Sequence, residues 1–350
     1  MSYKKIGEGS YGCIIKPALP CHNLTKKNFV SKILKKSRKS HIQELKISKR
    51  LNKSKKFNVK NHFCTIKGVC TLKHKDIPKN IRHDDLSSVD KKCRNTRIDP
   101  KDPKKKNTKY ISLLMENCGK KLFNKESLLF LKNNINLVQF IKHLLESLKY
   151  AKSKKIVLGD IKLDNMLLKN RKPILIDFGN SQIITSHKNL RNNINNIATS
   201  PAFSCPEIIL LKTVLENIED DAPNWENVPK LQENISYTDI LKTINEDSYI
   251  NEAGINGEID SDVSSKNIGK KLKQYYQLFK SKKFTDKFLK NYRKEIIYKI
   301  DIYSLGRVLE NIYDLLQLKN KKILGLINNM IELNHNNRFS VEECLDYMNK

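Results

Sequence analysis

Residues 156–181 read IVLGDIKLDNMLLKNRKPILIDFGNS, and this stretch decides the expected fold class. It holds two acidic turns, each next to an apolar run typical of a β-strand. In the first turn, Asp160 is followed by Lys162 and then by Asn165. In the second, about seventeen residues further along the chain, Asp177 opens the tripeptide Asp-Phe-Gly.

These polar residues suit phosphoryl transfer from ATP. That reaction needs a carboxylate that orients and deprotonates the attacking hydroxyl, and oxygen ligands that hold Mg²⁺ against the phosphates. We expect Asp160 to be the base and Lys162 to be a cation that reaches the transferred phosphoryl group. Asn165 and Asp177 are the expected metal ligands, because Mg²⁺ prefers a few carboxylate and amide oxygens and completes its shell with substrate phosphates. A surface β-hairpin that carries solvated charges is the alternative, and the upstream motifs disfavour it.

A glycine-rich segment lies almost at the start of the chain, where residues 6–14 read IGEGSYGCI. Glycine lets the backbone approach phosphate oxygens closely. A dinucleotide-binding fold would place a strand before such a segment and a helix after it. Residues 13–17 (CIIKP) instead favour a second strand, so we predict a β-turn-β lid over ATP.

A short apolar run at residues 29–32, FVSK, ends in Lys32, which would need a carboxylate to fix its position. Glu44 is the only acidic residue between Lys32 and Asp76. It lies in a predicted helix whose Ile42, Leu45 and Leu51 suit packing on a sheet. We therefore predict a Lys32–Glu44 ion pair; a solvated i,i+4 pair between Glu44 and a neighbouring lysine is the alternative.

The D-x-K-x-x-N motif at Asp160 and the D-F-G motif at Asp177 resemble those of eukaryotic-type protein kinases. The glycine-rich segment and Lys32 precede them in the order that the family has. The resemblance covers nearly the whole chain and implies an α+β, bilobal fold in a single kinase domain. The expected parts are a β-rich N-lobe at 1–115 with a basic insert at 73–109, a hinge at 116–119, and a helical C-lobe at 120–350 with an acidic insert at about 208–298.

The resemblance also implies ATP and Mg²⁺ as cofactors. Lys32 is expected to hold the α- and β-phosphates, Met115 to lie at the back of the adenine pocket, and the backbone of Glu116 and Cys118 to bind the purine edge. The expected nucleotide-binding residues are Ile6, Gly7, Gly9, Ser10, Gly12, Ile14, Val30, Lys32, Glu44, Met115, Glu116, Cys118 and Leu167.

Residues 126–152 show helical periodicity, as expected for the core of a second lobe. The resemblance implies that residues 200–207 end an activation segment in a variant A-P-E motif, with Ser200 contacting the catalytic Asp and Lys. It also implies that Asp301 tethers the catalytic-loop backbone, and that Glu207 and Arg338 form a buried ion pair.

One departure from the family has physical consequences, since H-R-D reads Leu158-Gly159-Asp160 here. Leucine replaces the packing of the histidine ring but not its hydrogen bonds, and glycine removes the arginine that clamps an activation-loop phosphate. We therefore predict activity that does not require phosphorylation at Thr199 or Ser200. Lys162 favours serine or threonine over tyrosine as the acceptor.

Composition and charge indicate which kinds of partner and cellular compartment suit the chain. The 350-residue chain has a formal net charge of +30, which favours non-specific attraction to nucleic acid or acidic targets, but no RNA-binding motif or zinc finger is apparent. The eight cysteines never form a C-x-x-C pair, which predicts reduced thiols in a cytosol-like compartment. Without a signal peptide or a membrane-length apolar run, we expect a soluble intracellular monomer.

The leading hypothesis is ATP- and Mg-dependent phosphorylation of serine or threonine in protein substrates. A pseudokinase scaffold, motivated by residues 158 and 159, and a small-molecule kinase are the alternatives. The PALPC sequence at 17–21 and the catalytic loop look similar to divergent serine/threonine kinases of large DNA viruses, which would place the protein in host cytoplasm or a virion. The acidic stretch 216–262, with Trp225, is a surface excursion, an intramolecular partner for the basic lobe or a docking platform.

Overall fold

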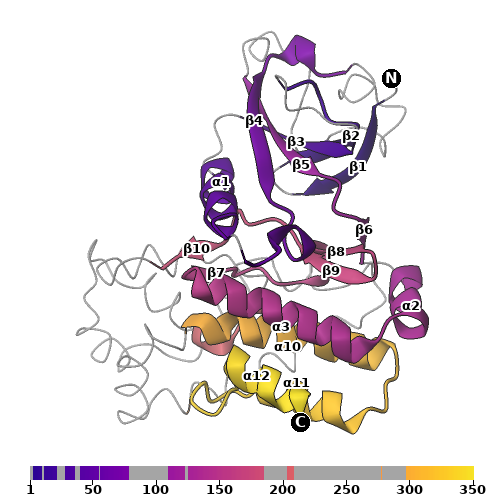
Figure 1. Ribbon diagram of the computed structural model, residues 1–350, viewed down its shortest axis with the longest axis vertical. Coiled ribbons are helices and arrows are strands. Elements are labelled where there is room, and N and C mark those ends of the chain that lie inside the picture. The colour runs from indigo at the N-terminus through magenta and orange to yellow at the C-terminus, as the bar shows by residue number, and fades with distance from the viewer. Residues whose placement is uncertain are drawn as a thin grey trace. The chain divides into compact units, whose positions relative to one another are not determined.

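The computed structural model describes residues 3–9, 12–21, 28–35, 40–54, 56–78, 109–122, 125–184, 203–208, 277 and 297–350. The chain divides into two compact units (Figure 1). Unit 1 comprises Met1–Lys120, Leu168–Asn170 and Ile174–Gly179. Unit 2 comprises Lys121–Leu167, Arg171–Pro173 and Asn180–Lys350.

Unit 1 is built on a five-stranded antiparallel sheet with the strand order β1-β2-β3-β5-β4. Its strands are β1 (Lys4–Gly9), β2 (Gly12–Lys16), β3 (Phe29–Lys35), β4 (Ile66–Leu72) and β5 (Tyr110–Glu116). The central strand β3 is buried from Phe29 to Leu34, and β5 beside it is buried from Tyr110 to Met115. Burial on both faces explains why most residues of the two strands are apolar, and the buried Ser112 hydroxyl donates to Ser31 Oγ at 2.9 Å.

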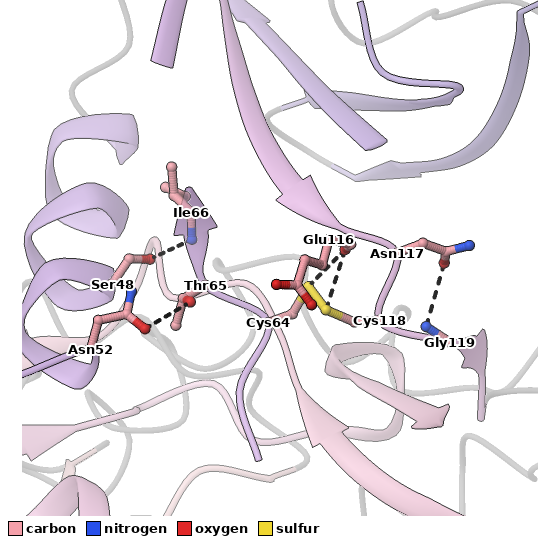
Figure 2. The surroundings of a disulfide bond; sticks show 9 residues. All are labelled: Ser48, Asn52, Cys64, Thr65, Ile66, Glu116, Asn117, Cys118 and Gly119. Atoms are coloured by element: carbon pink, nitrogen blue, oxygen red, sulfur yellow. Dashed lines mark hydrogen bonds between the residues drawn. A yellow bond between two sulfur atoms is a disulfide. The ribbon is translucent and has the colours of Figure 1, made fainter. Parts of the chain in front are cut away.

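Helix α1 (Ser40–Leu51) also belongs to unit 1, but its buried face differs from the predicted one. Ile42 is 46% exposed, so its predicted packing on the sheet is wrong, whereas Leu51 is buried. The buried face runs through Glu44, Ile47 and Ser48. The face includes polar residues because each has a partner: the Ser48 hydroxyl accepts a hydrogen bond from the backbone N–H of Ile66 at 3.1 Å (Figure 2).

Unit 2 is mainly helical, which confirms the helices predicted from the periodicity of residues 126–152. Its helices are α2 (Lys125–Asn134), α3 (Leu137–Ser153), α10 (Ile297–Leu315), α11 (Lys321–Met330) and α12 (Val341–Asn349). Helix α3 begins at a side-chain cap from Asn136 and packs on α10 and α12. Because α10 is buried over most of its length, it forms the centre of this unit. The sheet of unit 1 and these helices confirm the α+β class.

The stretch 156–181 forms short strands and turns. β7 (Ile156–Val157) pairs with β10 (Gln182–Ile183), and β6 (Lys120–Lys121), β8 (Met166–Lys169) and β9 (Lys172–Leu175) form a sheet of order β6-β8-β9. Asn170 and Arg171 connect β8 to β9 with φ values of 51° and 63°, as expected for a tight hairpin turn. The 3-10 turn η5 (Leu163–Asn165) lies directly before β8.

The prediction of reduced thiols is wrong for five of the described cysteines, namely Cys13, Cys21, Cys64, Cys70 and Cys118. Cys21 and Cys70 form a disulfide, as do Cys64 and Cys118, with Cα–Cα distances of 5.7 and 5.9 Å. The partners are 49 and 54 residues apart in sequence, so the fold of unit 1 brings them together and no local spacing motif could reveal them.

Several predicted features lie outside the described residues. These are Ser10, Thr199, Ser200, Trp225, most of the basic insert 73–109 and nearly all of the acidic insert 208–298. Among the helices that the structure describes, none is both long enough and apolar enough to cross a membrane.

Candidate active site

In unit 1, Lys32 is the centre of a three-residue ion-pair network. Its Nζ lies 2.9 Å from Glu44 Oε2 and 2.9 Å from Asp177 Oδ1. The predicted Lys32–Glu44 pair is therefore present, while the contact with Asp177 was not foreseen. Burial by itself lowers the pKa of Lys32, but the two carboxylates outweigh burial and hold this pKa above the usual lysine range. Lys32 is thus a fixed cation with two anionic partners.

Strand register gathers several predicted nucleotide-binding residues on one face of the sheet. Ile14 in β2 pairs with Lys32, and Val30 in β3 pairs with Met115 in β5. Directly opposed residues share a face, and residues two apart on one strand share it too. Ile14, Val30, Lys32 and Met115 therefore line the same side of unit 1.

The glycine-rich segment forms an antiparallel strand pair, with Ile6, Gly7 and Gly9 in β1 and Gly12 opposite Gly9 in β2. The pairing confirms that a second strand, and not a helix, follows the glycine-rich segment. Gly12 has a packing role as well, because a Cβ there would lie 2.7 Å from Leu34 Cδ2. The glycine at this position thus lets β2 approach β3 closely.

Asp177 has a φ of 60°, in the left-handed region that few residues other than glycine adopt. The next residue, Phe178, is 2% exposed and packs edge-on against Phe63, with ring centroids 5.9 Å apart. The preceding strand is held by two backbone bonds, from Leu175 N–H to His62 O and from Cys64 N–H to Leu175 O, both 2.9 Å. Strained conformations of this kind persist where the surroundings fix them, and they cluster at functional sites.

In unit 2, side chains converge on the carboxylate of Asp160. The amide nitrogen of Asn165 donates to Asp160 Oδ2 at 3.0 Å and to the Asp160 carbonyl oxygen at 2.9 Å. Lys162 Nζ lies 3.3 Å from the same Oδ2, and Asn180 Nδ2 donates to it at 3.4 Å. Asn180 was not predicted, although its position directly after Asp-Phe-Gly could have drawn attention to it. The three groups hold the carboxylate in place.

Asp301 in α10 holds the backbone of this loop, as the resemblance implied. Its buried carboxylate accepts hydrogen bonds from the N–H groups of Leu158 and Gly159, both at 2.8 Å. Burial raises the pKa of Asp301 to about 6, although these two bonds oppose the shift. The Ser181 hydroxyl donates to Leu158 O at 2.8 Å, a contact that sequence reasoning missed.

Gly159 has a φ of 82°. Glycine adopts this conformation without a steric penalty, so the replacement of the family's arginine suits the local backbone.

Glu207 and Arg338 form the expected buried ion pair, with both side chains 0% exposed. Arg338 donates through NH1 to Glu207 Oε1 and through NH2 to Glu207 Oε2, the latter at 3.1 Å. Burial raises the pKa of Glu207, but Arg338 more than offsets this and lowers it below the usual value. Buried Lys299 donates to the carbonyls of His335 and Arg338, at 3.0 and 2.6 Å, and so holds the loop that carries the arginine.

The remaining predicted residues are divided between the units. Glu116 ends β5 and Cys118 follows it, both in unit 1, whereas Leu167 lies in β8 and belongs to unit 2. The predicted metal ligands are divided too, with Asp177 in unit 1 and Asn165 in unit 2.

A family model for the protein kinase domain matches residues 1–221, which is more than half of the chain. The chain therefore belongs to the protein kinase family, whose members transfer phosphate to protein substrates. No curated protein matches the chain.

Proposed function

We propose that this protein kinase transfers the γ-phosphate of ATP, with Mg²⁺, to serine or threonine hydroxyls. The observation that carries the proposal is that each unit holds one complete polar cluster of the reaction. Unit 1 supplies the network of Lys32, Glu44 and Asp177, and unit 2 supplies Asp160 with its partners Lys162 and Asn165.

The oxygen ligands offered by Asn165 and Asp177 suit Mg²⁺ bound to a nucleotide. The amide nitrogen of Asn165 is committed to Asp160, which directs the amide oxygen to be the metal-binding atom. Asp177 offers a carboxylate, and neighbouring residues fix the backbone that carries it. Hard oxygen ligands of this kind suit Mg²⁺. The ion supplies charge neutralisation on the phosphates when it is bound. Lys32, fixed by Glu44, holds the α- and β-phosphates.

Asp160 accepts the proton of the attacking hydroxyl at its carboxylate. Asn165 and Asn180 orient that carboxylate, and Lys162 supplies positive charge where the transferred group gains negative charge. Lys162 also supports a serine or threonine acceptor in preference to tyrosine. We keep the interpretation of one kinase domain that acts as a monomer, with non-specific attraction to nucleic acid from its charge of +30.

The PALPC sequence at 17–21 and the form of the catalytic loop further support kinship with the kinases of large DNA viruses.

A scaffold without catalysis is the second candidate, because Leu158 and Gly159 replace the histidine and arginine of the family. Against it, Asp301 still holds the backbone of both residues and the carboxylate of Asp160 keeps its partners. Lys32→Ala separates the two candidates, since a scaffold keeps its partners and biological role without this lysine.

The direct test is transfer of labelled γ-phosphate from MgATP to a generic protein substrate, with acceptors identified by mass spectrometry. Wild type is compared with Asp160→Asn and with the matched control Asp346→Asn, an exposed carboxylate on α12. We expect label on serine and threonine that is lost with Asp160→Asn and kept with Asp346→Asn. Undiminished transfer by Asp160→Asn would refute the assigned base, and a folded wild type that binds ATP without transferring phosphate would favour the scaffold.

A further inference from the structure

The Cys64–Cys118 disulfide lies at the 116–119 segment, which the kinase resemblance predicts to bind the purine of ATP. Cys64 precedes β4, and Cys118 lies in the 116–119 segment after β5 (Figure 2). Both cysteines belong to unit 1, and they are 7% and 6% exposed. The disulfide therefore fixes the 116–119 segment covalently to the chain that leads into β4.

Cys64 extends this link to the strand that leads to Asp177. Its backbone N–H donates to Leu175 O, and the N–H of Leu175 donates to His62 O, both at 2.9 Å. Leu175 is two residues before Asp177, which contacts Lys32. One disulfide and two backbone hydrogen bonds thus connect the proposed purine-binding segment with a proposed magnesium ligand.

The two sulfur atoms also lie beside the carbonyl oxygen of Glu116. Cys64 Sγ is 3.5 Å and Cys118 Sγ is 3.3 Å from this oxygen (Figure 2). A disulfide sulfur carries no hydrogen, so neither sulfur donates to the carbonyl while the bond is intact. After reduction each cysteine has an S–H donor within reach of it. The thiols would then compete with the purine for this oxygen, since the Glu116 backbone is predicted to bind the purine edge.

We propose that the Cys64–Cys118 disulfide is a redox-sensitive element that sets the affinity of the kinase for MgATP, with tighter binding in the oxidised form. The proposal rests on the proposed function. In the reducing step, a dithiol gives two electrons and two protons to the S–S bond. Cys64 and Cys118 become thiols, and the dithiol becomes a disulfide.

Two effects act in the same direction. The intact bond pre-organises the 116–119 segment, so less conformational freedom is lost when the nucleotide binds. It also leaves the Glu116 carbonyl without a competing donor from either sulfur. Together we expect reduction to weaken MgATP binding about 3- to 10-fold.

The Cys21–Cys70 disulfide provides an internal control. Cys21 and Cys70 pack with Ala18, Phe29 and Leu114 in a buried apolar cluster of unit 1. This disulfide stabilises that cluster and includes no residue of the 116–119 segment. Its loss should therefore leave the response of MgATP binding to reduction in place.

The experiment measures the Kd of MgATP by calorimetry for the full chain, oxidised and after treatment with dithiothreitol. Peptide mapping of the oxidised protein without reductant checks the Cys64–Cys118 linkage directly. Cys64→Ala removes the bond and is compared with Cys70→Ala, which removes the other bond by the same substitution. Circular dichroism checks that each variant is folded. The comparison of oxidised with reduced wild type does not depend on the folding of any variant.

We expect a linked Cys64–Cys118 peptide, a 3- to 10-fold response in wild type and in Cys70→Ala, and no response in Cys64→Ala. The inference is overturned if the linked peptide is absent, if wild-type affinity is the same in both redox forms, or if Cys64→Ala still responds. Absence of MgATP binding in both redox forms would instead refute the proposed function, and the inference with it.

Discussion

The buried ion pair between Glu207 and Arg338 allows a sharp test of how unit 2 is held together. Both side chains are 0% exposed, and the guanidinium also donates through Nε to Glu332 O at 2.8 Å and lies 4.8 Å from the ring centroid of Tyr303. Arg338→Met keeps much of the side-chain volume but leaves the Glu207 carboxylate buried without its counter-charge. Removing one partner of such a pair costs about 3–5 kcal/mol.

The matched control is a surface pair in the same unit. Lys152 Nζ lies 2.7 Å from Glu342 Oε2, but these side chains are 28% and 43% exposed. Water solvates the charge that remains after Lys152→Met, so this change should cost only about 0.2–1 kcal/mol. The two substitutions remove the same charge, and the pairs differ in burial and in the further contacts of Arg338 with Glu332 and Tyr303.

Urea denaturation at neutral pH, followed by the helical circular dichroism signal, measures both free energies of unfolding. The double variant Glu207→Gln/Arg338→Met also removes the buried, uncompensated charge of Glu207. Its free energy of unfolding should therefore exceed that of Arg338→Met by at least about 1 kcal/mol. Because the folded pKa of Glu207 is lowered, the stabilisation is present at neutral pH and is lost as pH falls through that lowered pKa. The reasoning is refuted if Arg338→Met is no more destabilising than Lys152→Met, or if the double variant recovers nothing.

Three further changes test single features by urea denaturation. The folded pKa of Asp301 is about 6, above its ordinary value of 3.8, so its contribution to stability falls as pH rises from about 4 to about 6. Between about pH 4.5 and about pH 7, the stability of Asp301→Asn relative to wild type should therefore increase by about 2 kcal/mol, and an unchanged difference would contradict the shifted pKa. Gly119→Ala should cost at least about 2 kcal/mol, because φ is 119° and the added Cβ would lie 2.2 Å from Leu168 O; a neutral effect would contradict this backbone geometry. Ser340→Ala should cost about 1 kcal/mol, because Ser340 and Glu343 form a capping box at the start of α12, and no loss would mean that the cap contributes nothing.

The sequence was sufficient to predict a contact where only a few residues could meet its chemical requirement. Lys32 needed a carboxylate, and Glu44 was the only one between Lys32 and Asp76, so the pair could be predicted without knowing the fold. The kinase-like motifs likewise indicated the Asp301 tether, which depends on a carboxylate at a recognisable position.

Other features required the tertiary structure. Whether Lys32 also contacts Asp177, 145 residues away, depends on how the end of β9 meets β3, and no periodicity encodes this. Helix α1 buries Ser48 and exposes Ile42 because the partner of Ser48 is a backbone N–H of β4, not an apolar surface.

The cysteines separate the two kinds of information most clearly. The sequence contains no C-x-x-C pair, and the spacing of its cysteines does not indicate that Cys64 forms a disulfide with Cys118. A disulfide depends on the approach and direction of two Cβ atoms, and pairing of β4 with β5 sets these for residues 54 positions apart. Residue types and their order determined the family and the candidate chemistry of this protein. The packing of distant segments decided which of these groups contact one another, because such contacts depend on three-dimensional geometry that local sequence patterns do not record.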